Sequence, residues 1–283
     1  MDRFRIHGPE ISVAPFFPED KKKEVFKATK YKRQDGRASD ALRPVFIQAN
    51  LIPQAKGSVY FEAGQTKLAC SIYGPRQLKK QAFSAKATLI CDFKFATFSC
   101  TKRKGWLKDN KEKEMSSMLE QALAPAIRLE SYPKAAIEVF VTVIENGGTY
   151  SCLAAAITAA STALATAGIE MVDIITACSA VYIKDSLLLD ATEHEEDISS
   201  EGSTLLVALM PSLNLVTHIV QSNHIPSDVT LVQQGIQSCV DGCCQLHSVV
   251  THVLKTALET PTDSTPAQEK PLKLDITDGD KME

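Results

Sequence analysis

A short turn between an apolar segment and a small-residue segment has the residue types of an anion-binding site. Its five residues are Gly147, Gly148, Thr149, Tyr150 and Ser151. Backbone N–H groups at such a turn, together with the dipole of a following helix, can hold a phosphate group. A phosphoryl-transfer site would add an arginine, because guanidinium binds phosphate through two parallel hydrogen bonds. The available side chain is Tyr150, so the sequence predicts a vestigial phosphate site.

Basic and aromatic side chains alternate in a second candidate site. Residues 94–113 contain seven Lys or Arg and two acidic residues. The candidate RNA-binding cations are Lys94, Lys102, Arg103 and Lys104, and the aromatic residues among them are Phe95, Phe98 and Trp106. Cations hold nucleic-acid backbones and aromatic rings stack on bases. The alternative interpretation is that the phenylalanines pack in the core and the lysines are only solvated.

A third cluster, Cys239, Cys243, Cys244 and His247, has spacings that place several of its groups on one face of a helix. A metal site is conceivable there. We favour packing by small apolar side chains, because structural zinc sites usually take two ligands from a turn. The eight cysteines are scattered, which suits reduced thiols. We therefore expect no metal, no cofactor and no disulfide framework.

Composition indicates a globular chain with a large core. The chain has 283 residues, 44% of them hydrophobic, and a net charge of −3. No run approaches the roughly 20 apolar residues of a membrane helix, so we expect no membrane contact. The charge is uneven, since residues 21–43 hold nine basic and three acidic residues, whereas residues 184–201 hold seven acidic residues and one lysine. The basic segments suggest a polyanion or acidic partner, with solvated loops as the alternative.

The hydrophobic pattern predicts the elements that must position these groups. Strands are expected at 58–63, 66–73, 87–95, 137–143, 173–183, 187–190, 204–210 and 213–220, and helices at 114–129, 151–167 and 228–258. The helix at 151–167 is apolar nearly all round and should be central. We predict an N-terminal arm (1–32), one α+β domain (33–258) and a disordered C-terminal tail (259–283).

Several motifs occur along the chain in a fixed order. They are RQDGR at 33–37, Arg43-Pro44, Gly57-Ser58, GQTKLAC at 64–70, Gly74-Pro75 and NGGT at 146–149. With these motifs the chain resembles the RNase PH family, in particular its RNA exosome subunits. The resemblance implies an α+β RNase PH fold of the ribosomal protein S5 domain 2 type, with two βα halves.

For exosome members, the resemblance further implies a place in a six-membered ring that threads RNA. The implied partners are other RNase PH-like exosome subunits, S1/KH cap subunits and RNA. The implied locations are the nucleus, nucleolus and cytoplasm.

Family enzymes cleave the 3′-terminal phosphodiester with inorganic phosphate, which requires an anion clamp and carboxylates. In this chain the clamp arginine corresponds to Tyr150, and a nearby small hydroxyl residue corresponds to Leu153. Asp190 matches the first family aspartate, Glu196 replaces the second, and the next acidic position is Gly202. We interpret Asp190 as a strand-end residue in a solvated acidic loop.

These departures predict a catalytically inactive, RNA-contacting structural subunit with no catalytic residues. Arg33, Arg37 and Arg43 are expected to serve the fold or subunit contacts. The opposing hypothesis is an active phosphorolytic 3′-to-5′ exoribonuclease rebuilt from Glu196, Ser151 and a neighbouring subunit's arginine. A third is a free-standing RNA-binding protein.

Overall fold

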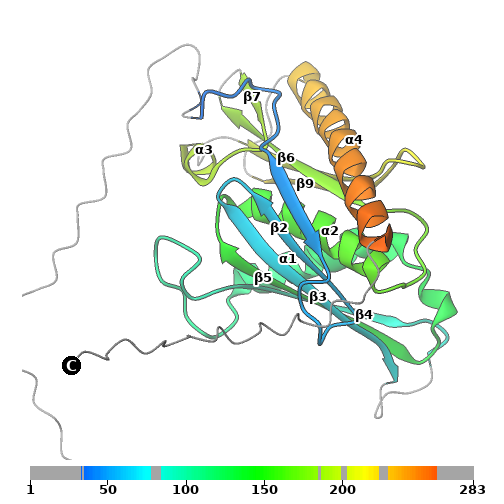
Figure 1. The fold of residues 1–283 in the computed structure, drawn as a ribbon. Coiled ribbons are helices and arrows are strands. Elements are labelled where there is room, and N and C mark those ends of the chain that lie inside the picture. Colours follow the sequence, from blue (N-terminus) through cyan, green and yellow to red (C-terminus); the bar gives the residue numbers. More distant parts are fainter. Residues whose placement is uncertain are drawn as a thin grey trace, which may run out of the picture.

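Two β-sheets and the helices packed on them make up the described chain (Figure 1). The computed structural model describes residues 33, 35–77, 84–183, 186–198, 203–222 and 229–259. The predicted arm at 1–32, almost all of the predicted tail and Gly202 lie outside these residues. Strands and helices are mixed along the chain, which confirms the predicted α+β class.

The first sheet has five strands in the order β1-β2-β3-β5-β4. They are β1 (Val45–Ala49), β2 (Gly57–Ala63), β3 (Thr66–Gln77), β4 (Thr88–Phe95) and β5 (Ala135–Glu145). Neighbours are antiparallel except for the parallel pair β4 and β5. Side chains alternate between the core and the other face, as a half-buried sheet requires. The predicted hairpin is confirmed, since β2 and β3 pair directly across a two-residue turn.

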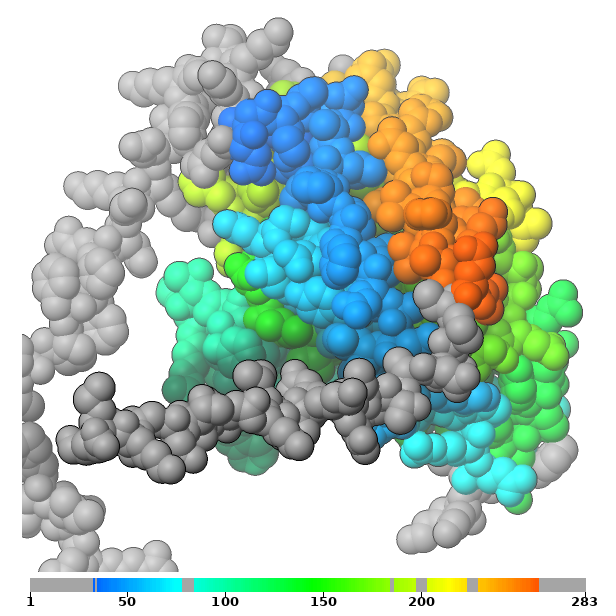
Figure 2. Space-filling view, viewed as in Figure 1, coloured from blue at the N-terminus to red at the C-terminus, as the bar shows by residue number. Residues whose placement is uncertain are grey.

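The second sheet has four antiparallel strands in the order β7-β6-β8-β9. They are β6 (Thr176–Ile183), β7 (Ser186–Leu189), β8 (Ser203–Met210) and β9 (Leu215–Ser222). The long C-terminal helix α4 (Val229–Glu259) packs on β6 and β8 and also contacts β1. Figure 2 shows this proximity on the surface, where residues 35–49 (blue) lie beside α4 (orange).

Helix α2 (Thr149–Thr166) contacts strands of both sheets and is buried over most of its surface. It confirms the central helix expected at 151–167. Gly57 on β2 allows this packing, because a Cβ there would collide with the carbonyl oxygen of Ala163 in α2. The core formed by α2 and its neighbouring strands fixes the position at which α2 begins.

Helix α1 (Asn110–Leu123) begins four residues before the predicted start and ends six residues before the predicted end. Asp109 and Glu112 form a capping box that fixes its N-terminus. Pro125 then lies in a 3₁₀ turn, η1 (Ala124–Ala126), because proline cannot continue an α-helix. A second 3₁₀ turn, η2 (Leu129–Ser131), precedes β5.

Apart from the two 3₁₀ turns, two elements were not predicted. Strand β1 is short and follows Pro44, and the acidic stretch expected to be a loop contains the six-residue helix α3 (Glu193–Ile198). Both elements are held by long-range contacts that local periodicity does not report. Among the described helices, none is long and apolar enough to cross a membrane.

Candidate functional site

The first turn of α2 binds a carboxylate from elsewhere in the chain. The N-terminal cap is Gly148, at φ 139°, which has no side chain to accept the free N–H groups of the turn. Glu196 accepts them instead, with its Oε2 2.5 Å from the nitrogen of Thr149 and its Oε1 3.2 Å from the nitrogens of Tyr150 and Ser151. We call these three N–H groups the N–H cradle.

Helix α3 carries Glu196 into the N–H cradle. The side chain of Asn146, just before the glycines, donates to Glu193 Oε1 at 3.0 Å, which fixes the turn against α3. Burial raises the pKa of Glu196 to about 7, although the backbone N–H groups of the cradle and the charge of Arg43 act in the opposite direction. Burial is therefore the dominant influence on this carboxyl.

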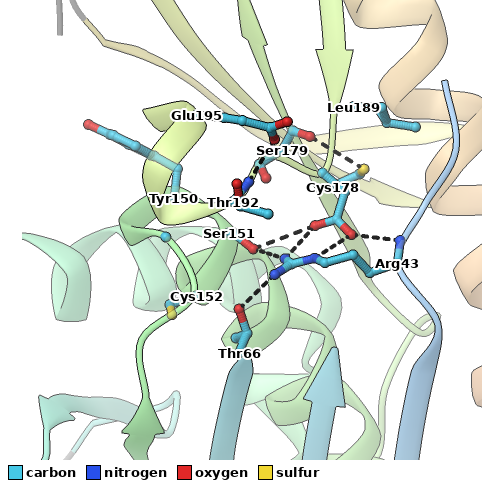
Figure 3. A network of polar contacts seen from close by, with 12 residues as sticks. Arg43, Thr66, Tyr150, Ser151, Cys152, Cys178, Ser179, Leu189, Thr192 and Glu195 are labelled. Atoms are coloured by element: carbon cyan, nitrogen blue, oxygen red, sulfur yellow. Dashed lines mark hydrogen bonds and ion pairs between the residues drawn. The ribbon is translucent and has the colours of Figure 1, made fainter. Parts of the chain in front are cut away.

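A buried ion pair lies beside the N–H cradle (Figure 3). Arg43 donates from Nε to Asp190 Oδ2 at 2.8 Å and from Nη2 to Asp190 Oδ1 at 2.6 Å. The same guanidinium also donates to Thr66 Oγ1 at 3.1 Å and to Ser151 Oγ. Burial opposes ionisation of Asp190, but the hydrogen bonds and charge of Arg43 hold its pKa below the usual value.

The interpretation of Asp190 as a residue of a solvated loop was wrong. Only 14% of its side chain is exposed, and it accepts hydrogen bonds from both the backbone and the side chain of Arg43. Its backbone at φ 50° ends β7 and turns the carboxylate into the interior. The many acidic residues around Asp190 suggested a solvated loop, whereas its ion-pair partner Arg43 lies 147 residues earlier in the chain.

Two further arginines fasten the chain before β1 to the end of β7. Arg33 donates to the carbonyl oxygen of Leu189 and lies 3.3 Å from Glu195 Oε1. Arg37 donates to the carbonyl oxygens of Ala41, at 3.1 Å, and of Asp190, at 3.4 Å. Together with the contacts of Arg43, these bonds show that the three arginines serve the fold, which is one part of the expectation that they serve the fold or subunit contacts.

Tyr150 does not replace the missing clamp arginine. Its side chain points away from the Arg43 network in Figure 3 and packs, partly buried, against the core. Leu153, at the other changed position, is fully buried. Arg43 is instead the cation beside the turn, since its Nη1 lies 3.1 Å from the position of a Cβ built on Gly147. Asp190 neutralises that charge.

Of the predicted RNA-binding cations, Lys94 lies near the end of β4 and the other three lie in the loop 96–109 (teal in Figure 1). Their contacts divide them into two pairs. Lys94 donates to the carbonyl oxygen of Trp106 at 3.0 Å, and Lys104 lies 3.6 Å from the ring centroid of buried Phe95. These two therefore hold the loop. Lys102 and Arg103 are exposed.

Two large aromatic side chains of the same loop face solvent. Phe98 is 73% exposed and Trp106 is 74% exposed. The alternative interpretation, that the phenylalanines pack in the core, holds for Phe95 and is wrong for Phe98. A backbone hydrogen bond of 2.9 Å from Asn146 to the carbonyl of Ser99 joins the base of the loop to the glycine turn.

The thiols near the C-terminus do not converge on one centre. Cys239 and Cys243 are buried in α4 with Cys178 of β6, and Cys244 is exposed. Cys243 contacts the carbonyl oxygen of Val207, 3.7 Å away. Within the part of the chain that the structure describes, no three His, Cys, Asp or Glu side chains are arranged to hold a metal ion.

The buried central helix, the two sheets and the glycine turn are the features of an RNase PH-type protein. The model of the "3' exoribonuclease family, domain 1" (RNase_PH) matches residues 41–170. The chain is 33% identical to "Exosome complex component mtr3" of Schizosaccharomyces pombe, over 89% of this chain and 95% of that protein. It is 36% identical to "Exosome complex component MTR3" of Homo sapiens, over 90% and 95% respectively. The chain therefore belongs to the RNase PH family, in the branch that these Mtr3 proteins represent.

Solved structures agree on the fold. Rice (Oryza sativa) Rrp46 has a TM-score of 0.64 and 23% identity, covering 80% of this chain and 100% of that one. A structure described as the Archaeoglobus fulgidus exosome with RNA bound to the active site has a TM-score of 0.68 and 18% identity, covering 77% and 92%. At these identities the similarity establishes the α+β RNase PH fold, which confirms the predicted fold class.

Sequence reasoning missed the role of Glu196. We treated it as a displaced substitute for a catalytic aspartate, whereas it accepts the free N–H groups of α2. One signal could have found this contact, because a helix that begins at glycine with no acidic residue in its first turn needs an acceptor from elsewhere. The sequence does not show which acidic residue provides it.

Proposed function

We propose that this chain is a non-catalytic structural subunit of the RNA exosome ring that contributes to RNA binding and threading in 3′-to-5′ RNA processing and degradation. The similarity to Mtr3 proteins named as exosome components supports this assignment. The proposed processes are rRNA maturation and mRNA decay, in the nucleus, nucleolus and cytoplasm. The proposed partners are other RNase PH-like subunits, S1/KH cap subunits and RNA.

The occupied anion site is the observation that carries the non-catalytic assignment. Phosphorolysis needs a bound phosphate with positive charge to stabilise the transition state. In this chain the N–H groups of the turn are bonded to Glu196, and the neighbouring guanidinium of Arg43 is paired with Asp190. Attacking phosphate would therefore meet a carboxylate where it needs donors, and we propose that the site is vestigial as a catalytic centre.

This assignment predicts that the chain releases no nucleoside diphosphates from single-stranded RNA in the presence of Mg²⁺ and phosphate. The measurement is chromatography of the products, first for the full-length chain and then for the chain assembled with its ring partners. The Archaeoglobus fulgidus exosome, whose solved structure has RNA in its active site, is the positive control. Phosphate-dependent release by the chain alone would favour the opposing hypothesis of an active exoribonuclease.

If the assembled complex shows phosphorolysis, partner subunits with their own active sites could be its source. Two variants of this chain then show which subunit carries the activity. Asp190→Asn and Tyr150→Phe alter the candidate site, so phosphorolysis that continues unchanged in both comes from another subunit. A loss confined to Asp190→Asn with normal assembly would place chemistry in this chain.

The loop 96–109 supports the proposed RNA contact. It presents the exposed cations Lys102 and Arg103 together with the exposed rings of Phe98 and Trp106. This combination suits single-stranded RNA, because cations hold the backbone and aromatic side chains stack on bases without regard to sequence. Lys94 supports the loop from β4, so we propose that it contributes to binding through loop shape.

Charge reversal at Lys102→Glu and Arg103→Glu is expected to weaken RNA binding by the assembled complex. If each residue contacts one phosphate, the slope of log K against log salt should become shallower by about 1.4. The measurement is a fluorescence-anisotropy titration at several salt concentrations. Trp106→Ala should cost about 1 to 3 kcal/mol of binding free energy for each base that stacks on the ring, without changing the salt slope.

Lys111→Glu and Lys113→Glu provide a matched control, because both side chains are exposed in the same basic segment but lie on α1 outside the loop. An equal loss of RNA binding in the control pair would show that net charge, rather than the loop, attracts RNA.

The outer edge of the second sheet supports a place between subunits. Strand β9 lies at that edge, and Leu215, Val216 and Ile219 along it are 53%, 45% and 48% exposed. Apolar side chains on an edge strand are typical of surfaces that another chain covers. We propose that an RNase PH-like partner covers this edge.

A further inference from the structure

The N–H cradle of α2 is filled by an anionic group from the chain itself. Glu196 uses both carboxylate oxygens, one toward Thr149 at 2.5 Å and the other toward Tyr150 and Ser151 at 3.2 Å. Two oxygens of a phosphate or sulfate bind N–H groups at a helix start in the same manner. The carboxylate of Glu196 thus stands in for an oxyanion ligand.

The shape of the turn fits a group that approaches the backbone closely. A Cβ built on Gly148 would lie 2.8 Å from Glu196 Oε1. The residue also has φ 139°, a backbone conformation that is strained for any residue with a Cβ. Gly147 is equally constrained, because a Cβ there would collide with Thr66. Both glycines are therefore required for the present turn, and the space above Gly148 is the space that the carboxylate fills.

A cation also remains beside the N–H cradle. Arg43 Nη1 lies 3.1 Å from the Cβ position of Gly147, and Arg43 Nη2 donates to the hydroxyl of Ser151, whose N–H belongs to the cradle. Asp190 pairs with Arg43, and Glu196 adds a second carboxylate. Removal of Glu196 would leave three free N–H groups next to a guanidinium and would remove one negative charge.

We propose that Glu196 is a built-in anion that closes an otherwise competent oxyanion site, and that removing its carboxylate lets the N–H cradle bind a tetrahedral oxyanion such as inorganic phosphate. The site has therefore been filled rather than dismantled. This inference deepens the proposed non-catalytic role, but it rests on the contacts of Glu196 and is tested by anion binding rather than by RNA cleavage. Either proposal can fail alone, because an oxyanion site could be opened in a chain that still lacks the groups for phosphorolysis.

The experiment compares three full-length chains, namely the wild type, Glu196→Ala and Glu193→Ala. Glu193 is the matched control, because it is a carboxylate of the same helix. It accepts a hydrogen bond from the side chain of Asn146 rather than from the N–H cradle. Each chain is unfolded thermally at pH 8, where Glu196 is ionised, in phosphate, in sulfate and in chloride at the same ionic strength. Titration calorimetry with phosphate provides an independent readout.

Relative to chloride, phosphate is expected to raise the Tm of the wild type and of Glu193→Ala by the same small amount, which is the general effect of a kosmotropic anion. For a site with a Kd of about 1 mM, phosphate at about 50 mM should raise the Tm of Glu196→Ala by about 5 to 9 °C beyond that general effect, since a ligand that binds only the folded state stabilises it by mass action. Sulfate should act similarly, because it presents the same tetrahedral oxygens.

Two results would overturn the proposal. One is a folded Glu196→Ala chain that gains neither a phosphate-dependent Tm shift nor calorimetric binding, and the other is an equal gain in Glu193→Ala, which would indicate a general charge effect. If Glu196→Ala does not fold, Glu196→Ser takes its place, because its short side chain also leaves the N–H cradle open and carries no charge. No phosphate-dependent shift in a folded Glu196→Ser chain would also overturn the proposal.

Discussion

Replacing Arg43 by methionine is expected to lower the free energy of unfolding by about 3 to 5 kcal/mol, because the buried carboxylate of Asp190 would lose the guanidinium that hydrogen-bonds to it and keep the more distant Arg37, 4.0 Å away. Arg43 supplies Asp190 with hydrogen bonds of 2.9, 2.8 and 2.6 Å, the first from its backbone. Methionine retains the backbone bond and much of the side-chain volume but no charge. The remaining carboxylate would have to take up a proton or draw water into the interior, and both cost free energy.

Chemical denaturation of the wild type and of Arg43→Met measures this loss. The double variant Arg43→Met with Asp190→Leu should recover most of it, because removing both charges leaves no unpaired carboxylate. Lys67→Met is the control for loss of an ion pair, since Lys67 and Glu145 lie 2.9 Å apart on the surface with 35% and 47% of their side chains exposed. It should have a much smaller effect. An Arg43→Met chain as stable as Lys67→Met would contradict the prediction.

Replacing Glu196 by glutamine is expected to remove a pH dependence of stability that the wild type shows between about pH 4.5 and pH 7. Burial raises the pKa of Glu196 from its ordinary 4.5 to about 7. In that window the folded state retains a proton that the unfolded state releases, so stability falls as the pH rises and the loss is complete above pH 7. The difference in pKa corresponds to about 3 kcal/mol. Glutamine has no such proton, and its carbonyl oxygen still accepts from the N–H groups of α2.

The measurement is the free energy of unfolding of both chains at pH 5 and pH 8. Titrations that the two chains share cancel in the difference between them at each pH, so this difference isolates Glu196. Glu196→Gln should gain about 2 to 3 kcal/mol relative to the wild type between the two pH values, because pH 5 already lies above the pKa of the unfolded carboxyl. Parallel profiles would show that the Glu196 carboxyl titrates at the same pH in the folded and unfolded chains.

Local patterns predicted much of the fold. The β2–β3 hairpin follows from two apolar runs around Gly64, and the buried α2 follows from a helical segment that is apolar nearly all round. The end of α1 follows from Pro125. These features depend on residues close together in the chain, which is the range over which periodicity and turn chemistry act.

The candidate site depends on contacts that sequence spacing cannot show. Glu196 lies 45 to 47 residues from the N–H groups it accepts, and Asp190 lies 147 residues from Arg43. Helix α3 has six residues and no apolar periodicity of its own, so its acidic sequence suggested a loop. The loss of the clamp arginine could be predicted, whereas the group that fills the site could not.

Glu196 belongs to the same chain as the N–H cradle that it fills, and this determines how the site responds to anions in solution. Because the carboxylate and the N–H groups belong to one chain, their encounter does not depend on the concentration of any solute, and a fixed geometry gives an effective concentration far above that of a free ion. Phosphate in solution would compete with a ligand that never diffuses away. Fluctuations in cellular phosphate should therefore leave the start of α2 unchanged, together with the loop 96–109 that Asn146 joins to it.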